Sequence, residues 1–584
     1  MSKMNKKNVL ALWDTQSFSG IDTRASGDGE GKIKSMVNFR ILSDGSIEKR
    51  NGFRFAGSIG KKIRAVKIAE GEGNIFGYAV AENRVFKLNF DSNGMLSQYS
   101  DIGSIGTSEG RVSVFFYRGT CYISDSTDIY SIIGNSVISC EGYVPLYGKD
   151  WPTDYAGEIN EPLNMLTRRA RISYVATDPP TIFLPTLHEV ESVQAVYRND
   201  VLVPSHEYEI DNNFRTVNIA GLNAGDRILM YLTYKEQMAR TNEFNEVTEA
   251  ITFGGINDSR VFMWKENGNR LFCSSYVSEE SLQSSQAVYG QSGALYFPSK
   301  CMFAVGDGTR AIKGAGRHYG RLLIFTDGET WMADAQYGGL EELPLMRINS
   351  ANGAASPDGV TKCGNEPISV DSGRILRWRS NTDELDDCNS YSISDEILPY
   401  LSDEFFKKAL AFEDKYHGEI LFALPEDSDG RIYVYEEKKG NWYFFDGIKV
   451  NGFFDAKKNV GFFSGTSLYI FDDDLENDMV DAQSLKSIAA ELVTHPIDFG
   501  LPHRTKRISR VRAVAESNGQ AIDVRLLSDN AVNCTATVGT DGTDLVRSYE
   551  TRIVSDRFVR TALYVKSGSS KNVRIYRLSV AVKK

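Results

Sequence analysis

The sequence predicts an all-β protein: a β-propeller of six or seven blades, with a small β-sandwich inserted into it and a second β-sandwich at the C-terminus. Composition is the first reason, because 31 Phe, 28 Tyr and 51 Gly against 15 Pro favour aromatic-rich strands joined by glycine turns. Length is the second, since 584 residues with 41% hydrophobic content can form several cores. The third is repetition: units centred near Asp327, Ser372, Gly430 and Gly465 recur at roughly the 40–50-residue interval of propeller blades.

Residues 1–165 are predicted to hold an N-terminal hairpin and the first propeller blades. The hairpin joins strands at residues 36–42 and 46–53 through a turn at Ser43-Asp44-Gly45. Further strands of the first blades are expected at residues 75–80, 84–90, 112–117, 121–124 and 129–133.

Residues 170–236 are predicted to be an inserted β-sandwich module. A segment rich in Pro, Gly and acidic residues, 151–161, precedes it and marks a change in composition. Six short strands follow, separated by turns such as Asn223-Ala224-Gly225-Asp226, and strands this short at this spacing are typical of a sandwich.

Residues 237–485 are predicted to supply the remaining blades, of which the clearest covers residues 402–447. A short helix is expected over residues 404–412, capped by Ser402 and Asp403. Three strands follow at residues 419–425, 431–435 and 442–445. The turn residues between them, Asp427 to Gly430 and Lys439 to Asn441, favour tight hairpins, so the segment is an antiparallel meander like one blade.

Residues 486–584 are predicted to form the C-terminal β-sandwich. Long strands are expected here, and they alternate: Val511, Ala513 and Ala515 share one face, opposite Arg510 and Arg512. One apolar and one polar face per strand is the pattern of a sheet that packs against a second sheet.

The charge of the chain is acidic and unevenly distributed. With 66 basic and 77 acidic residues the net charge is −11, which argues against a general nucleic-acid binder. Residues 486–584 nevertheless hold 17 basic and nine acidic residues, a net charge of +8, which leaves −19 for residues 1–485. Seven scattered cysteines without a CxxC pair suit a reducing compartment. The apolar run at residues 9–13 is too short for a signal peptide, and no apolar segment approaches the roughly 20 residues of a membrane span. We therefore expect a soluble protein that is made in the cytoplasm.

The motifs with a possible catalytic meaning all have a structural explanation. Residues 106–110 match GxSxG, but Ser108 lies between β-strand pairs and lacks the strand-to-helix elbow of a hydrolase. The glycine-rich residues 314–320 open no helix, so a blade turn is favoured over a phosphate site. Residues 327–331 resemble the aspartate box of sialidase propellers with the spacing short by one residue, and such boxes are turns.

Two acidic segments could bind a hard cation. The loop with Asp472, Asp473, Asp474, Glu476 and Asp478 could chelate calcium, although a solvated acidic loop is favoured. Residues 427–430 begin like an EF-hand loop, but the strand resumes at once. The histidines show no ligand spacing; they are His188, His206, His318, His417, His495 and His503. We predict no catalytic, cofactor-binding or metal-binding residues.

Three segments resemble a known family. The hairpin with Asn38, Gly45, Arg50 and Gly52 resembles the opening of tail hub and nozzle proteins of short-tailed bacteriophages, where an Asn strand turns through Gly into a basic strand ending in Arg-x-Gly. Asn51 stands where that family usually has proline. The run 393–425, with the strand at 432–435 and Trp442, looks like the helix and blade of the packaged-DNA stabilisation branch. The turn at residues 224–227 is similar to a small β-module shared by phage tail and fibre proteins. The residues that carry the resemblance are Asn38, Gly45, Arg50, Gly52, Tyr435 and Trp442.

The resemblance implies a structural virion protein in the phage tail, assembled in the host cytoplasm. Such a subunit forms a homo-oligomeric ring, expected to be hexameric, below the portal and its adaptor proteins. The ring extends the DNA channel, retains the packaged genome and carries tail fibre or plug (needle) proteins. Double-stranded DNA would pass its lumen without sequence-specific binding, because an acidic wall repels phosphate. From the motifs we expect no enzyme activity and no cofactor, and from the length of the apolar segments no membrane span.

The alternative is a glycan-binding or glycan-cleaving propeller that acts as a receptor-binding tail protein. An enzyme of that kind would need inward-facing arginine and carboxylate clusters on one propeller face, whereas a hub needs none.

Overall fold

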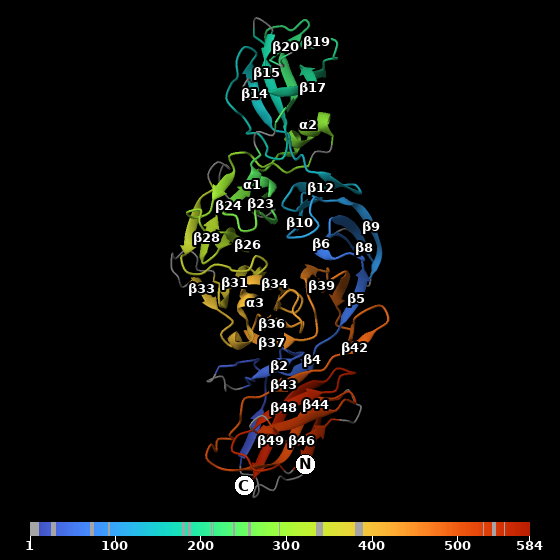
Figure 1. Ribbon diagram of the computed structural model, residues 1–584, viewed down its shortest axis with the longest axis vertical. Coiled ribbons are helices and arrows are strands. Elements are labelled where there is room, and N and C mark those ends of the chain that lie inside the picture. Colours follow the sequence, from blue (N-terminus) through green and yellow to red (C-terminus); the bar gives the residue numbers. More distant parts are fainter. Residues whose placement is uncertain are drawn as a thin grey trace.

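The chain folds into a closed propeller that carries a β-rich module at each end (Figure 1). The structure is a computed structural model that describes residues 11–24, 31–69, 75–91, 94–177, 181–184, 189–211, 213, 215–236, 240–254, 259–290, 293–333, 343–379, 389–528, 531–539, 545–553 and 555–583. The prediction of an all-β propeller with two sandwiches is confirmed, and the described residues build seven blades. None of the helices among them is both long and apolar enough to cross a membrane.

Each blade is a four-stranded antiparallel sheet. Blades 1 to 3 consist of β6 (Ile63–Ala69), β7 (Ile75–Ala81), β8 (Arg84–Phe90) and β9 (Leu96–Ser104); β10 (Ser113–Tyr117), β11 (Thr120–Ser124), β12 (Ile129–Ile133) and β13 (Ser136–Ser139); β22 (Glu249–Phe253), β23 (Arg260–Trp264), β24 (Arg270–Cys273) and β25 (Met302–Ala304). Blade 4 consists of β26 (Ile312–His318), β27 (Arg321–Thr326), β28 (Glu329–Ala333) and β29 (Leu345–Asn349).

Blades 5 to 7 complete the ring. They consist of β30 (Val360–Cys363), β31 (Glu366–Asp371), β32 (Arg374–Trp378) and β33 (Ser390–Ser392); β34 (Leu410–Asp414), β35 (Glu419–Ala423), β36 (Ile432–Glu436) and β37 (Asn441–Phe445); β38 (Gly452–Asp455), β39 (Val460–Ser464), β40 (Ser467–Phe471) and β5 (Phe53–Ser58). The innermost strands contact their neighbours in a cycle: β6, β10, β22, β26, β30, β34, β38 and β6 again. Because β5 comes from the N-terminal segment and pairs with β40, both ends of the propeller chain meet in blade 7.

The inserted module follows blade 2 and lies beyond the ring in Figure 1. One of its sheets has the order β14-β15-β21-β17-β18 and the other the order β16-β20-β19. Its strands are β14 (Leu146–Pro152), β15 (Arg169–Val175), β16 (Thr181–Phe183), β17 (Val190–Arg198), β18 (Val201–Leu202), β19 (Tyr208–Ile210), β20 (Thr216–Ile219) and β21 (Arg227–Tyr234). The module therefore begins at Leu146, earlier than the expected residue 170, because β14 pairs in parallel with β15.

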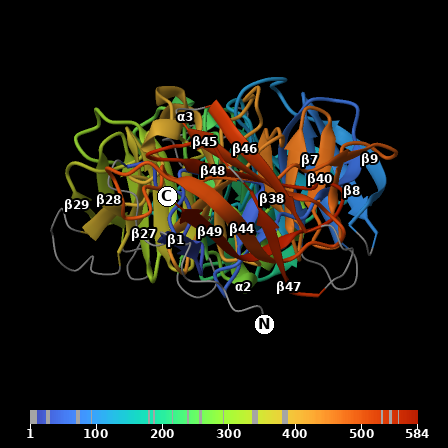
Figure 2. The same cartoon turned by 90° about the horizontal axis from the view of Figure 1, so that it is seen from below.

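The sandwich at the other end is built from both ends of the chain. One sheet has the order β3-β4-β49-β44-β47 with β1 added to β49, and the other continues from β2 through β43, β48 and β45 to β46. These strands are β1 (Ala11–Thr15), β2 (Ser35–Val37), β3 (Phe39–Ile41), β4 (Ile47–Lys49), β43 (Glu491–Val493), β44 (Arg507–Glu516), β45 (Ile522–Ser528), β46 (Ala531–Val538), β47 (Arg547–Arg552), β48 (Ala562–Ser567) and β49 (Arg574–Lys583). Seen from below, β44, β48 and β49 cross the middle of the molecule while strands of blades 1 and 4 project on either side (Figure 2).

The N-terminal hairpin thus belongs to the C-terminal sandwich. The predicted segment 1–165 had instead grouped the hairpin with the first blades. Ile47 of β4 pairs with Ile575 of β49, and Met36 of β2 pairs with Leu492 of β43. On its other side β2 pairs in parallel with β37, so blade 6 and one sandwich sheet form a single nine-stranded sheet. One apolar core accordingly runs from blades 5 to 7 into the sandwich.

Two local predictions need correction. The helix expected over residues 404–412 is α3 (Asp403–Lys408), and from Leu410 the chain becomes β34. Apolar Leu410 and Phe412 suit the period of a strand as well as that of a helix, and pairing with β35 decides the outcome. The glycine-rich residues 314–320 are not a turn but mostly strand β26, where a Cβ at Gly314 would lie 2.6 Å from Val360 Cγ2. Glycine there lets blades 4 and 5 approach closely.

The remaining short elements are α1 (Asn242–Asn245), α2 (Glu279–Tyr289), the 3-10 helix at Leu398–Tyr400, and the hairpin of β41 (Asn477–Met479) and β42 (Leu485–Ser487). Thr241, Ser278 and Ser402 each cap the helix that follows with a side-chain oxygen. The hairpin of β41 and β42 follows the acidic loop after blade 7, at the border between propeller and sandwich.

Candidate functional site: an ion-pair junction and an axial cavity

Asn38 connects three parts of the molecule at the border between propeller and sandwich. Its backbone φ is 56°, a left-handed conformation that asparagine tolerates better than most residues. Its side-chain amide donates to the carbonyl of Ala489, and its side-chain oxygen accepts from Arg50 Nε and from the backbone N–H of Asp446, each at 2.9 Å. The sandwich, the hairpin and blade 6 therefore share one side chain.

Arg50 forms a buried ion pair with the acidic loop. Both of its terminal nitrogens lie 2.8 Å from the carboxylate oxygens of Asp478, and the two side chains are only 2% and 3% exposed. A bidentate pair of this kind is strong and directional, and removing one partner would leave the other charge buried. Next to it, burial lowers the pKa of Lys49 to about 8, and its ammonium donates to the carbonyls of Glu476 and Ser569 at 3.0 Å.

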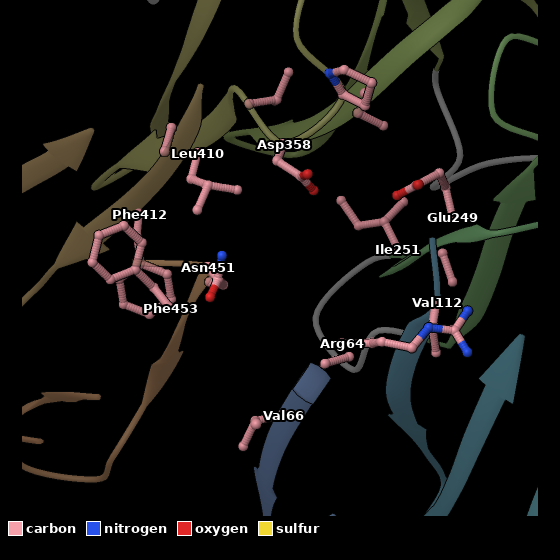
Figure 3. A pocket seen from close by; sticks show the side chains of 18 of the residues that line it. Arg64, Val66, Val112, Glu249, Ile251, Asp358, Leu410, Phe412, Asn451 and Phe453 are labelled. Atoms are coloured by element: carbon pink, nitrogen blue, oxygen red, sulfur yellow. The ribbon is translucent and has the colours of Figure 1, made fainter. Parts of the chain in front are cut away.

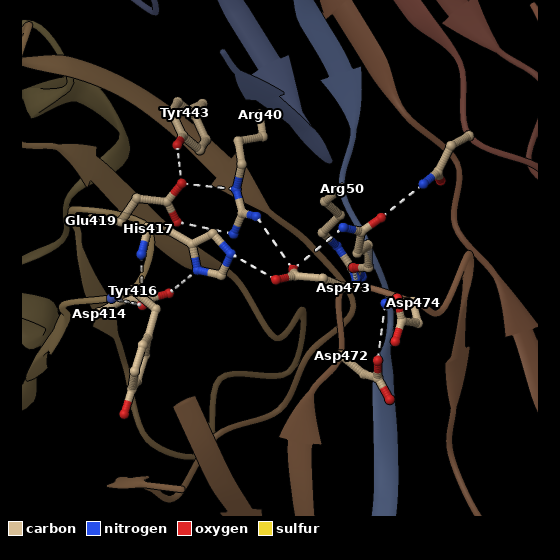
Figure 4. Close-up of polar contacts among 12 residues, drawn as sticks. Arg40, Arg50, Asp414, Tyr416, His417, Glu419, Tyr443, Asp472, Asp473 and Asp474 are labelled. Carbon is tan, nitrogen blue, oxygen red and sulfur yellow. Dashed lines mark hydrogen bonds and ion pairs between the residues drawn. The ribbon is translucent and has the colours of Figure 1, made fainter. Parts of the chain in front are cut away.

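The acidic loop that could have chelated a cation is instead held by basic side chains. Asp472 accepts from Arg54 Nε at 2.7 Å, Asp473 lies 3.2 Å from His417 Nε2, and Asp478 faces Arg50. Asp472 and Asp473 point to different partners rather than to a common centre (Figure 4). The loop therefore makes ion pairs with blade 7 through Arg54, with blade 6 through His417 and with the hairpin through Arg50.

Three side chains of blade 6 form a cluster with the composition of a metal site. Potential ligand atoms of Asp414, His417 and Glu419 lie within 4.8 Å of one another. However, Arg40 contacts both carboxylate oxygens of Glu419, with Nε at 2.8 Å and a terminal nitrogen at 3.1 Å, and the Tyr443 hydroxyl donates to it at 2.5 Å. Arg40 already supplies the positive charge that a metal ion would bring (Figure 4), so the cluster does not fit a metal.

His417 supplies the second positive charge of this cluster. Its ring nitrogens lie 2.7 Å from Asp414 and 3.2 Å from Asp473. Burial alone would lower the pKa of His417, but the hydrogen bonds to the two carboxylates outweigh burial and raise the pKa to about 9. The same contact lowers the pKa of Asp473 to about 2. Asp414, His417 and Glu419 are close in sequence, but Asp473 and Arg40 approach them only in the folded chain, so the sequence alone does not predict these ion pairs.

The other residues that carry the family resemblance lie on the hairpin or in blade 6. A Cβ at Gly52 would lie 2.0 Å from the Asn477 carbonyl, and Gly45, with a φ of 81°, turns the hairpin next to Ser17. Trp442 is fully buried, donates to the Ile393 carbonyl at 2.6 Å and packs against Tyr435 with ring centroids 5.0 Å apart. Asn38, Gly45, Arg50 and Gly52 thus lie on the hairpin, whereas the side chains of Tyr435 and Trp442 pack inside the propeller.

A second candidate site is a cavity of about 380 Å³ on the propeller axis, at the end where the inner strands begin. Figure 3 shows Phe412 and Phe453 on one side of it and Glu249 and Arg64 on the other. Phe412, Phe453 and Val66 also line a second cavity of about 530 Å³, whose other lining residues come from blades 1, 2 and 7.

Arg111 links three blades beside the axial cavity. It makes an ion pair with Glu249 of β22, and its terminal nitrogens lie 2.7 Å from both oxygens of Asp358, which precedes β30. Burial raises the pKa of Glu249 to about 7 although Arg111 lowers it. Arg64 instead donates to the carbonyls of Glu82, Thr107, Glu109 and Gly110.

The predicted motifs contribute to neither site. Ser108 is exposed in the loop before β10 and makes no hydrogen bond with the described residues, and Asp327 is exposed in the turn between β27 and β28. Asp427 accepts from the backbone N–H of Arg431 in the hairpin between β35 and β36. Among the other histidines His206 and His503 are exposed, His318 is buried in β26 and His495 contacts the Asp22 carbonyl, while His188 lies outside the described residues.

No protein-family model and no curated protein matches this sequence. Among solved structures, the chain is similar to PorZ, a surface component of the type-IX secretion system of Porphyromonas gingivalis, with 9% identity and a TM-score of 0.35 over 76% of this chain and 42% of that one. It is also similar to the AfRom2 CNH domain, with 7% identity and a TM-score of 0.32 over 72% and 99%. An exo-β-1,3-galactanase of Phanerochaete chrysosporium matches with 10% identity and a TM-score of 0.21 over 91% and 100%. These likenesses carry no functional argument.

Proposed function

We propose that this chain is a structural subunit of the tail of a short-tailed bacteriophage, a hub or nozzle protein below the portal and its adaptor. The observation that carries the proposal is the junction: Asn38 and Arg50, two of the residues that carry the resemblance to that family, join the hairpin to the propeller and the sandwich through buried contacts. A tail subunit must transmit force between its neighbours without coming apart, and buried ion pairs and a shared sheet serve that purpose.

The proposed DNA channel lies between subunits and not along the propeller axis. Arg111, which precedes blade 2, makes ion pairs with Glu249 of blade 3 and with Asp358 before blade 5, so these side chains reach across the ring. In a ring of subunits, expected to be hexameric, the channel would be enclosed by neighbouring chains. The net charge of −19 on residues 1–485 suits a wall along which DNA slides, because it repels phosphate.

The proposal includes no catalytic activity for the junction. Glu419, Asp478 and Asp473 face the cationic side chains of Arg40, Arg50 and His417, so none of these groups is left poised to transfer a proton to a substrate. The portal-adaptor and the fibre or plug proteins are the partners that this reading expects.

The test is to locate the chain in the particle. Immunogold electron microscopy and quantitative mass spectrometry of purified virions should place it in the tail at a copy number equal to the ring symmetry. A protein that is produced during infection but absent from purified virions would contradict the proposal. A second measurement is the native mass of the chain assembled with portal and adaptor, which should correspond to a ring of copies. A single copy on a symmetric tail would also contradict the proposal.

The runner-up, a glycan-binding or glycan-cleaving propeller, has one specific observation in its favour. The axial cavity gathers Arg64, Glu249 and Asp358 on one propeller face, the kind of arginine and carboxylate cluster that an enzyme of this class would need.

A further inference from the structure

The cavity of about 530 Å³ contains two lysine side chains without a counter-ion. Lys67 of β6 and Lys457, in the loop between β38 and β39, both line it, and neither ammonium group makes a hydrogen bond or an ion pair with a residue that the structure describes. Asp455 is the one carboxylate among the described lining residues, and it already accepts from Lys415 Nζ at 2.5 Å and from the Tyr416 hydroxyl at 3.1 Å. Two positive charges therefore remain unpaired in this cavity.

Lys67 stands in a recess and not on a convex surface. Its side chain is exposed, yet the protein around it excludes enough water to lower the pKa of its ammonium group, although Asp455 raises that pKa. Partial loss of hydration makes an unpaired charge costly, and an anion bound beside Lys67 would offset this cost. The positive recess also stands out against the net charge of −19 on residues 1–485.

The remaining lining of the cavity is largely aromatic. Five phenylalanine side chains contribute to it, and four of them are only half-buried: Phe76, Phe116, Phe412 and Phe453. The rings of Phe412 and Phe453 lie with centroids 5.6 Å apart and an angle of 30° between their planes (Figure 3). A small inorganic anion would leave these rings in contact with water, whereas a ligand with an aromatic body would cover them.

The cavity has room for a small molecule and an opening to solvent. Its volume of about 530 Å³ is many times the roughly 30 Å³ of a water molecule and lies within the roughly 300–1,000 Å³ typical of small-molecule sites. Gly119, in the turn between β10 and β11, lines the cavity and is exposed, and a Cβ there would meet no atom within 4 Å. A ligand can therefore enter past this turn.

We propose that this cavity binds a small aromatic carboxylate, whose negative charge lies against the ammonium groups of Lys67 and Lys457 while its ring packs on the half-buried phenylalanine side chains. The charge of the ligand answers the two unpaired lysines, and its ring answers the aromatic lining. This site goes beyond the proposed tail role and does not depend on it.

The test is isothermal calorimetry of the full-length protein with three probes that separate charge from aromatic body. The probe 1-naphthoate has both, 1-naphthamide has the aromatic body alone, and inorganic phosphate has the charge alone. We expect 1-naphthoate to bind with millimolar affinity or better, and roughly tenfold more tightly than either of the other probes. Lys67→Met keeps an unbranched apolar side chain but removes the charge, so it should weaken 1-naphthoate binding roughly tenfold and leave 1-naphthamide binding unchanged. Lys457→Met should act in the same direction, whereas Lys67→Arg keeps the charge and should retain binding.

The matched control is Lys458→Met. Lys458 follows Lys457 in the chain and is exposed, but it does not line the cavity, so its substitution changes the net charge equally and should leave 1-naphthoate binding unchanged. Thermal unfolding of each variant establishes that it is folded. The proposal is overturned if 1-naphthoate does not bind at millimolar concentration, if 1-naphthamide or phosphate binds as tightly, or if Lys67→Met and Lys458→Met bind 1-naphthoate alike.

Discussion

At the scale of single residues, the junction shows why charged side chains can be buried without being catalytic. Arg40, Arg50 and His417 each face a carboxylate that the fold brings from elsewhere in the chain. The sequence analysis predicted the importance of Arg50 and Asn38 from the resemblance alone. It could not predict their partners, because Asp478 and Ala489 are more than 400 residues away along the chain.

Asp478→Ala should destabilise the protein strongly. It leaves the guanidinium of Arg50 buried without its counter-ion, and breaking one side of such a pair costs about 3–5 kcal/mol in the free energy of unfolding. The matched control is Asp101→Ala, which breaks the solvent-exposed pair with Arg84 on blade 1 and should cost below about 1 kcal/mol. Urea denaturation of both variants measures the two losses in the free energy of unfolding. Equal losses would show that the buried ion pair stabilises the protein no more than the exposed pair does.

His417 should make the free energy of unfolding decrease as the pH becomes alkaline. Its pKa in the folded protein is raised from 6.5 to about 9, so the protonated form is favoured by folding. The stabilisation is complete below about pH 6.5 and is lost as the pH rises towards about 9. We therefore expect the free energy of unfolding to fall between pH 6.5 and 9 in the native protein, and to fall less in His417→Gln. Denaturation curves at several pH values test this, and parallel profiles would count against the ion-pair network.

At the scale of elements, strand periodicity predicted most blades, but it did not predict which strands pair when they are far apart in the sequence. The meander at residues 419–445 was evident because its turns contain Asp427, Gly430 and Gly440, residues that tight hairpins need. By contrast, nothing in the local sequence of β5 shows that it pairs with β40 or completes blade 7. The axial cavity was equally invisible, since its lining comes from the inner strands of all seven blades.

Trp442→Ala should destabilise blade 6. The side chain is fully buried between Phe422 and Tyr435 and donates to the Ile393 carbonyl, so truncation leaves both a cavity and an unpaired carbonyl. We expect a loss of about 3–5 kcal/mol in the free energy of unfolding. Trp442→Phe keeps much of the volume and should lose less. Chemical denaturation of the two variants compares them, and a small effect of the alanine variant would mean that the blade repacks around the space.

At the scale of the whole molecule, the N-terminal and C-terminal segments of the chain pair with each other in the same sheets. Strands β1 to β4 complete the sandwich, β5 completes the propeller, and β2 joins blade 6 to the sandwich. The inserted module stands apart from this arrangement, because its apolar core contains only residues of its own segment. The sequence predicted a propeller, an inserted sandwich and a C-terminal sandwich. It assigned the hairpin to the propeller instead of the C-terminal sandwich, because the local pattern of a hairpin does not identify the sheet that it joins.

This organisation predicts opposite behaviour for two fragments of the protein. Residues 146–235, the inserted module, include both of its sheets and its whole core, so the isolated fragment should fold as a monomer. Residues 486–584 lack β1 to β4, which leaves β49 and β43 with unpaired edges and removes Phe39 and Ile47 from the core, so this fragment should stay unfolded or aggregate. Circular dichroism and thermal melts distinguish the outcomes, and addition of a peptide covering residues 11–51 should restore structure to the second fragment. A cooperative melt of residues 486–584 alone would show that the sandwich does not need the N-terminal strands, and would contradict the view that both ends of the chain build one unit.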